Sequence, residues 1–221
     1  MTASFKTPKI LVLSLAIMLG LALSCSNAHA QSGNTAVVAG GCFWCVESDF
    51  ESVRGVREAV SGYTGGTVAN PTYKQVTRGG TGHYEAVQIQ FNPNQVSYAQ
   101  LMQLFFRSVD PTDAGGQFCD RGSSYRTAIF YANESQRQAA EAAKAEAQRA
   151  LGRQIVTPIL PLQTFYPAEE YHQDYYRGRS RVVTRFGIKR QADAYKAYRQ
   201  ACGRDQRVQQ LWGNNAPFIG H

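Results

Sequence analysis

The 221-residue chain is poor in charge, because Asp, Glu, Lys and Arg make up only 18% of it while 43% of the residues are hydrophobic. Disordered chains have the opposite balance, so the composition excludes a mainly disordered protein. Beyond its first 25 residues the chain has no apolar run long enough to cross a membrane, which excludes a polytopic membrane protein. Collagen-type, coiled-coil and low-complexity repeats are absent, and no linker divides the chain. We therefore expect one globular domain with a buried core.

Residues 1–30 have the layout of an export signal. Two lysines precede an apolar run over residues 10–23, and a small-x-small cleavage site follows at 28–30. The run is too short for a comfortable membrane span, so we predict a secretory signal peptide and an exported, periplasmic protein. Two alternatives stay open, an uncleaved N-terminal anchor and a lipoprotein lipidated at Cys25.

Cysteine is scarce once this signal is removed. An exported protein can keep disulfides, but the remaining cysteines are too few for a disulfide scaffold. We therefore expect them to serve chemistry. They are Cys42, Cys45, Cys119 and Cys202.

The pattern of apolar residues predicts an α+β fold over residues 31–221. The order of strands and helices is that of a two-layer split β-α-β plait, which is the ferredoxin-like arrangement. Its core spans about residues 35–176, with long loops of the kind that carry function and an irregular C-terminal tail at 177–221. The predicted strands are 35–39, 56–63, 84–91, 125–131 and 155–160. The predicted helices are 42–53, 97–108 and 134–151, and the predicted irregular loops are 65–82 and 109–124.

One local pattern points to reactive sulfur. Gly40 and Gly41 end a predicted strand, and Cys42 then opens a helix. Unpaired amides and the positive dipole end of a helix favour an anion, so we expect a lowered pKa and a larger thiolate fraction at Cys42. The alternative is a buried structural cysteine, which two adjacent aromatic residues and two glycines make less attractive.

Cys42 and Cys45 also form a Cys-x-x-Cys pair, which several kinds of site share. Haem attachment requires histidine directly after the second cysteine, where this chain has Val46. A structural zinc site needs a second close pair of ligands, and Cys119 and Cys202 are far apart in sequence, so we predict no metal site. A thioredoxin-like dithiol stays open, although its tryptophan would precede the first cysteine.

Two further patterns carry no predicted site. The glycines at 79–82 lack the Lys-Ser/Thr ending of a phosphate-binding loop, so we interpret them as a flexible turn. Basic residues of the tail are scattered, and we interpret them as a solvated face and expect no nucleic-acid partner. They are Arg177, Arg179, Arg181, Arg185, Lys189 and Arg190.

At this point four motifs resemble the A-type peptide methionine sulfoxide reductases. They are Gly-Cys-Phe-Trp at 41–44, Gly-His-Tyr-Glu-Ala-Val at 82–87, Asp-Arg-Gly-Ser-Ser-Tyr-Arg at 120–126 and Tyr-His-Gln-Asp-Tyr at 171–175. They stand in the family's order and span most of the mature chain. One such motif is weak, whereas four in order are highly specific.

The resemblance implies a role for each matched residue. Cys42 would be the nucleophile, and Phe43 and Trp44 would form an apolar pocket for the methyl group of the sulfoxide. Glu85 would donate a proton to the sulfoxide oxygen as the S–O bond weakens.

Three further residues match the family's substrate contacts. Tyr73 and Tyr125 would hydrogen-bond the sulfoxide oxygen, and Asp120 would orient the substrate. For His172 we expect a structural role.

The implied reaction is the reduction of methionine S-sulfoxide, in proteins or as the free amino acid, to methionine. The cysteine is left as a sulfenic acid, a second thiol condenses with it to a disulfide, and an external dithiol such as thioredoxin reduces that disulfide. No metal or organic cofactor is needed, and we expect a monomer.

The second thiol is not fixed by the resemblance. We rank Cys202 first, because a mobile tail suits a resolving thiol, and Cys45 second, because it lies one helical turn from Cys42. Cys119 follows, since it would lie near the site if Asp120 does, and a relay through two of these cysteines is a further option.

Two other functions stay open at this stage. One is a thiol–disulfide oxidoreductase that uses Cys42 and Cys45. The other is a non-catalytic module that binds oxidised or apolar peptides through Phe43 and Trp44.

Overall fold

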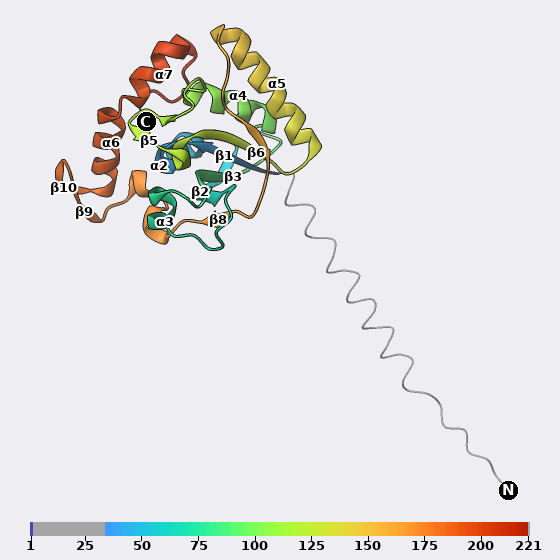
Figure 1. Ribbon diagram of the computed structural model, residues 1–221, viewed down its shortest axis with the longest axis horizontal. Coiled ribbons are helices and arrows are strands. Elements are labelled where there is room, and N and C mark those ends of the chain that lie inside the picture. The colour runs from blue at the N-terminus through green and yellow to red at the C-terminus, as the bar shows by residue number, and fades with distance from the viewer. Residues whose placement is uncertain (2–33, 221) are drawn as a thin grey trace. The chain divides into compact units, whose positions relative to one another are not determined.

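Within the described residues, the main sheet has six strands in the order β7-β6-β1-β3-β2-β8. The structure is a computed structural model that describes residue 1 and residues 34–220 (Figure 1). The four central strands pair antiparallel in the order β6-β1-β3-β2, which confirms the predicted split β-α-β plait. β7 joins the edge at β6 in parallel, and β8 joins the other edge at β2. The strands are β1 (Thr35–Gly40), β2 (Val56–Thr64), β3 (Tyr84–Phe91), β6 (Thr127–Tyr131), β7 (Ile159–Pro161) and β8 (Tyr166–Pro167).

Alternate residues of β1 enter two different cores. Ala36 and Val38 belong to the large core beneath the helices, whereas Val37 and Ala39 pack on the opposite face of the sheet. This is the two-residue period of a strand whose two faces are both covered. The central strand is therefore buried on both sides, and the residue that follows its end is held firmly.

The predicted helices are confirmed as α2 (Phe43–Glu51), α4 (Tyr98–Ser108) and α5 (Glu134–Leu151). Ser97 and Gln100 form a capping box that starts α4, and the Asn133 side chain caps α5. Gly152 ends α5 in the left-handed conformation. α4 and α5 lie side by side (Figure 1).

The two segments predicted to be irregular contain short elements, so that prediction is wrong in part. α3 (Tyr73–Arg78) lies within 65–82, where Thr72 and Gln75 make a capping box that the analysis missed. The segment 109–124 contains the small hairpin β4 (Gly116–Gln117) and β5 (Asp120–Arg121) and then the 3₁₀ turn η2 (Ser123–Tyr125). The strand predicted from 125 therefore begins two residues later.

The segment after about 167, which includes the predicted tail at 177–221, is ordered as far as residue 220, so the prediction of an irregular tail is wrong. It packs because Tyr195 and Arg199, one helical turn apart, are buried against the domain together with Arg204. Its elements are the 3₁₀ turns η3 (Glu170–His172), η4 (Tyr175–Arg177) and η5 (Gly213–Asn215), the hairpin β9 (Arg181–Thr184) and β10 (Gly187–Arg190), and the helices α6 (Gln191–Ala201) and α7 (Arg204–Trp212).

The predicted signal peptide at 1–30, including Cys25, lies outside the described residues. In the part of the chain that is described, no helix combines the length and apolarity that a membrane crossing requires.

Candidate active site

Cys42 stands at the junction of β1 and α2, as the sequence predicted. It is the N-cap residue of α2 and is only 7% exposed. Gly41 before it has φ +81°, and a Cβ there would approach the Gln117 Cβ to 2.5 Å. Only glycine fits this turn, which explains why a glycine precedes the cysteine.

Cys42 and Cys45 are both free and lie side by side under the tail. They share a buried cluster with Tyr175 and Tyr195 of the C-terminal segment, and Cys45 is 2% exposed. The expectation of a lowered pKa at Cys42 is wrong. A hydrogen bond with Cys45, followed by burial, raises the pKa of Cys42 well above its ordinary value.

Two carboxylates and two arginines also act on this thiol pair. The negative charges of Glu85 and Asp120 add to the raised pKa of Cys42. The pKa of Cys45 is lowered, first by its hydrogen bond with Cys42 and further by the charge of Arg204. The hydrogen bond between the two thiols, followed by burial, therefore favours the protonated form of Cys42 over the anion that the helix dipole alone would favour.

Glu85, on β3, is buried directly against the start of α2. Its Oε2 accepts a hydrogen bond from the Phe43 amide at 3.1 Å, and its Oε1 has no hydrogen-bond partner. Burial raises the pKa of Glu85 to about 8, and the charge of Asp120 adds to this rise. At neutral pH the carboxyl is therefore mostly protonated and holds a proton available for donation.

Phe43 and Trp44 form an aromatic wall with residues from the tail. Trp44 stacks on Tyr175 with ring centroids 3.8 Å apart, and its indole Nε1 donates to His172 Nδ1 at 3.2 Å. Phe43 packs 5.0 Å from the His172 ring. Burial lowers the pKa of His172 to about 4, so this ring is neutral and can accept the indole hydrogen bond. His172 thus positions the wall, and Tyr175 is a member that the sequence analysis missed.

Tyr73 and Tyr125 come together from different segments, as predicted. Tyr73 is the first residue of α3, and its amide donates to Glu169 Oε1 at 2.9 Å. The Tyr125 hydroxyl interacts with both Tyr73 and Glu85. Both phenols therefore border the unpaired carboxyl oxygen, where an oxygen of a substrate would lie.

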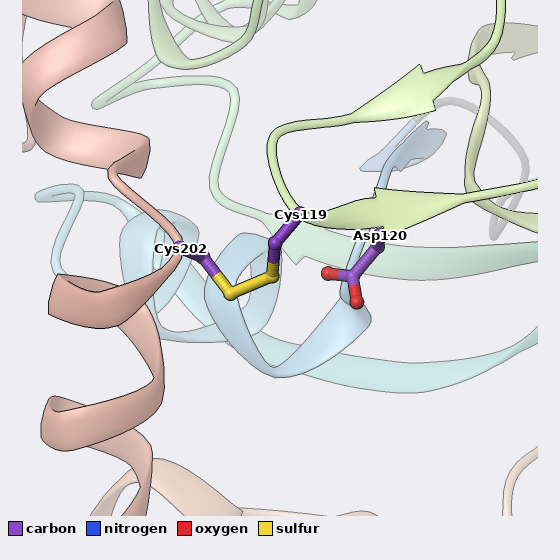
Figure 2. A group of neighbouring side chains, drawn as sticks. All are labelled: Cys119, Asp120 and Cys202. Atoms are coloured by element: carbon purple, nitrogen blue, oxygen red, sulfur yellow. A yellow bond between two sulfur atoms is a disulfide. The ribbon is translucent and has the colours of Figure 1, made fainter.

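Asp120 lies beside the second pair of cysteines, which form a disulfide (Figure 2). Cys119 and Cys202 are 83 residues apart in sequence, yet their Cα atoms are 4.9 Å apart. The Tyr198 hydroxyl donates to Asp120 Oδ2 and lies 3.8 Å from Cys119 Sγ. Cys202 ends the ordered helix α6, so its assignment to a mobile tail is wrong, and its distance from Cys119 in sequence was misleading.

A buried ion cluster joins the tail to the catalytic helix, and the sequence analysis missed it. Asp49 of α2 pairs with Arg199 at 2.7 Å and with Arg204 at 3.5 Å, and the side chains of all three are at most 4% exposed. Arg204 also donates to the Gly40 carbonyl at 3.1 Å. The only signal in the sequence was the acidic residues of α2. A buried arginine needs a partner, and the sequence does not reveal which residue that partner is.

Comparisons with known proteins agree with these motifs. A family profile described as "Peptide methionine sulfoxide reductase" matches residues 34–215. The chain is 48% identical over 205 residues to "Peptide methionine sulfoxide reductase MsrA 2" of Rhizobium meliloti (strain 1021), covering 91% of this chain and 96% of that one. It is 47% identical over 206 residues to the protein of the same name from Caulobacter vibrioides, covering 93% and 98%.

Two solved structures share the fold. Methionine sulfoxide reductase A of Corynebacterium diphtheriae is 31% identical with a TM-score of 0.62, covering 72% of this chain and 84% of that one. Reduced Mxr1 from Saccharomyces cerevisiae is 32% identical with the same TM-score of 0.62, covering 65% and 83%. Because the profile spans nearly all of the described residues and the relatives match along almost their whole length, the chain belongs to the A-type peptide methionine sulfoxide reductases, and its activity is the thiol-dependent reduction of methionine sulfoxide.

Proposed function

We propose that Cys42 and Glu85 perform this reduction together, on methionine S-sulfoxide in proteins and peptides and on the free amino acid. The observation that carries this assignment is the buried Glu85 carboxyl, which is protonated at neutral pH and has one oxygen unpaired. It lies against the first amide of α2, next to the cysteine that caps that helix. The S epimer and the protein substrates are those of the family that the motifs resemble.

The first step transfers oxygen from the substrate to Cys42. Cys42 loses its thiol proton as its sulfur attacks the sulfoxide sulfur, and that proton replaces the one that Glu85 gives up, so no net proton is consumed. Glu85 protonates the sulfoxide oxygen as the S–O bond breaks. Oxygen ends on the cysteine as a sulfenic acid, and methionine leaves as the thioether.

Substrate binding is divided between two kinds of surface. The wall of Phe43 and Trp44 suits the methyl group, because it is apolar and already rigid. Tyr73 and Tyr125 suit the oxygen, because two phenols can donate to it beside Glu85. Asp120, held by the Tyr198 hydroxyl, suits the orientation of the peptide.

We assign the first resolving step to Cys45, ahead of Cys202, which led the ranking from sequence. Cys45 shares a hydrogen bond with Cys42 and has the lowered pKa, so it is placed to attack the sulfenic acid and release water. Cys119 and Cys202 would then take over the oxidation by disulfide exchange. The described state, with that pair oxidised and the inner pair free, is the state such a relay would reach.

A thioredoxin-like dithiol would reduce the outer disulfide, and no organic cofactor is required. Cys119 is exposed, and a cavity of about 520 Å³ opens beside Cys202 between Asp113 and Arg207. The inner thiols are buried, whereas Cys119 is exposed. This division gives the external reductant one accessible disulfide.

We further propose that residues 1–30 are removed on export, which leaves the enzyme in the periplasm as a monomer. The support is the sequence pattern of a charged start, an apolar run and a small-x-small site. Expression of the full chain with its signal and mass measurement of the mature N-terminus tests this. A mature chain that begins at Gln31 is expected, whereas lipid on Cys25 or an uncleaved chain would contradict it.

The assay for the proposed chemistry uses peptides with either epimer of methionine sulfoxide. The wild type should remove one oxygen from the S epimer only, as read by mass spectrometry. The enzyme is first fully reduced and then allowed one turnover without reductant. Disulfide mapping over time should find the Cys42–Cys45 bond first and the Cys119–Cys202 bond later. Unslowed disulfide formation in Cys45→Ser would refute the first resolving step while leaving the reductase chemistry intact.

A further inference from the structure

One group of three possible metal ligands stands out among the described residues. The side chains of Cys119, Asp120 and Cys202 offer two sulfur atoms and one carboxylate oxygen, all within 4.8 Å of one another (Figure 2). In the described state both sulfurs are used in the disulfide. When an external dithiol reduces that bond, the same backbone presents two thiols and a carboxylate at one point.

We propose that reduction of this disulfide creates a binding site for a thiophilic divalent cation, Zn²⁺ or Cd²⁺, ligated by Cys119 Sγ, Cys202 Sγ and an Asp120 carboxylate oxygen. Binding releases the two thiol protons, and no electrons are transferred in that step. Oxidation of the two thiolates to the disulfide by the sulfenic-acid relay removes two ligands and expels the ion. The outer cysteine pair therefore either binds the ion as two thiolates or forms the disulfide, but not both.

The geometry fits a tetrahedral ion with one open position. Zinc lies about 2.3 Å from thiolate sulfur and about 2.0–2.2 Å from carboxylate oxygen, which places neighbouring ligands about 3.5–4 Å apart. The three ligand atoms lie within 4.8 Å of one another, and the two bonded sulfurs must separate after reduction to reach the spacing that zinc requires. Sulfur and oxygen donors of this mixture select zinc or cadmium over magnesium or calcium.

The surroundings permit this small movement and supply a position for the carboxylate. Cys119 is exposed at the turn between β4 and β5, and Cys202 ends α6 directly before Gly203, which has φ +67°. Tyr198 holds Asp120 through its hydroxyl, so the carboxylate is oriented by a second residue, as ligands in metal sites commonly are. Among the described residues, Cys42 and Cys45 do not form such a group of three ligand atoms with a carboxylate within the same 4.8 Å limit.

The metal binding stands independently of the proposed function, whereas its effect on turnover rests on the proposed relay. An ion that holds Cys119 and Cys202 prevents their oxidation, so it blocks recycling of the enzyme through the outer pair. Turnover driven by a protein dithiol should therefore fall when zinc is present, and return when a chelator is added. A first turnover that ends at Cys42 and Cys45 needs neither outer thiol.

Direct binding of Cd²⁺ and Zn²⁺ to the full chain tests the site. The protein is reduced with a phosphine, since dithiothreitol itself binds these ions, and cadmium–thiolate absorption and zinc stoichiometry are recorded. We expect one ion per chain in the reduced double variant Cys42→Ser/Cys45→Ser, in which the outer pair and Cys25 are the remaining thiols, and none at the outer pair when the same variant is oxidised. Loss of the absorption in reduced Cys119→Ser and Cys202→Ser is also expected.

The carboxylate ligand has a matched control on the same loop. Asp120→Ala should weaken zinc binding at least about tenfold, since loss of even an outer partner of a metal site costs about 10–100-fold. Asp113→Ala removes a nearby acid that is outside the group and should leave affinity unchanged. Equal binding by oxidised and reduced chains, no thiolate absorption in the folded double variant, or binding that survives loss of both outer cysteines would each overturn the proposal.

Discussion

The two cysteine pairs of this protein differ in almost every physical respect. Cys42 and Cys45 are neighbours along one helix turn, buried and free, whereas Cys119 and Cys202 are brought together from distant segments, near the surface, and bonded. Burial favours chemistry that must exclude water, and exposure favours a meeting with another protein. The difference fits the proposed relay, in which substrate reduction and enzyme recycling use separate thiol pairs.

The largest expected effect distinguishes the roles of the inner and outer cysteine pairs. Cys42→Ser should lower the rate of sulfoxide reduction by at least about 10³-fold, because it removes the nucleophile. Cys119→Ser should keep the first turnover and lose turnover driven by a protein dithiol. Rapid-quench mass measurement of oxygen loss reads the first effect, and steady-state rates with thioredoxin read the second. Equal losses of activity in both variants and both assays would contradict separate roles for the two cysteine pairs.

The next effect concerns the carboxyl of the inner pair. Glu85→Gln keeps an acceptor for the Phe43 amide but has no acidic proton to transfer, so the single-turnover rate should fall about 10²–10⁴-fold. Wild-type activity should decline as pH rises through about 8, where the raised pKa of Glu85 places its deprotonation. The variant should lack that decline. A decline at the same pH in Glu85→Gln would assign it to another group.

The same substitution should have the opposite effect on stability. Burial raises the pKa of Glu85 from 4.5 to about 8, so the folded chain binds a proton that the unfolded chain releases between these values. The free energy of unfolding therefore falls as pH rises across this interval. Glu85→Gln removes that loss and should stabilise the protein by roughly 1–3 kcal/mol at pH 7, but not at pH 4. Denaturant titrations at the two pH values measure this difference.

A third effect tests how the tail that carries the outer pair is attached to the inner pair. Asp49→Ala leaves Arg199 and Arg204 buried without their shared carboxylate, which should cost about 3–5 kcal/mol of unfolding free energy. Asp205→Ala removes the more exposed partner of Arg199 and should cost less than half as much. Thermal or urea unfolding of the two variants gives the comparison. Similar losses would show that the cluster is not the anchor.

The smallest effect concerns the residue between the two pairs. Tyr198→Phe removes the hydrogen bond to Asp120, which is worth about 1 kcal/mol, so KM for a sulfoxide peptide should rise about fivefold with kcat little changed. Tyr131→Phe, half-buried at the end of β6, is the matched control. A fall in kcat alone would indicate that Tyr198 acts on the thiols rather than on substrate orientation.

Much of the fold followed from local pattern. Three local patterns predicted the elements that form: the alternation in 84–91, the serine before 98 and the alanine-rich stretch at 134–151. Each element makes its own backbone hydrogen bonds or cap and presents one apolar face, so its signal lies within its own sequence. The tail was misjudged because its helices α6 and α7 depend on buried arginines, whose partner lies far away in α2. Tertiary partners of that kind leave no periodic signal.

The sequence alone determined the nucleophile candidate, the aromatic wall, the acid and the family, because these residues stand in contiguous motifs. Only the tertiary structure decided the direction of the pKa shift at Cys42 and the pairing of Cys119 with Cys202. The disulfide joins segments 83 residues apart, and the pKa of Cys42 is raised first by its hydrogen bond with Cys45 and then by burial, which only the folded chain provides. A helix dipole can be inferred from local order, but the burial that opposes an anion at the same sulfur is fixed only when the chain folds.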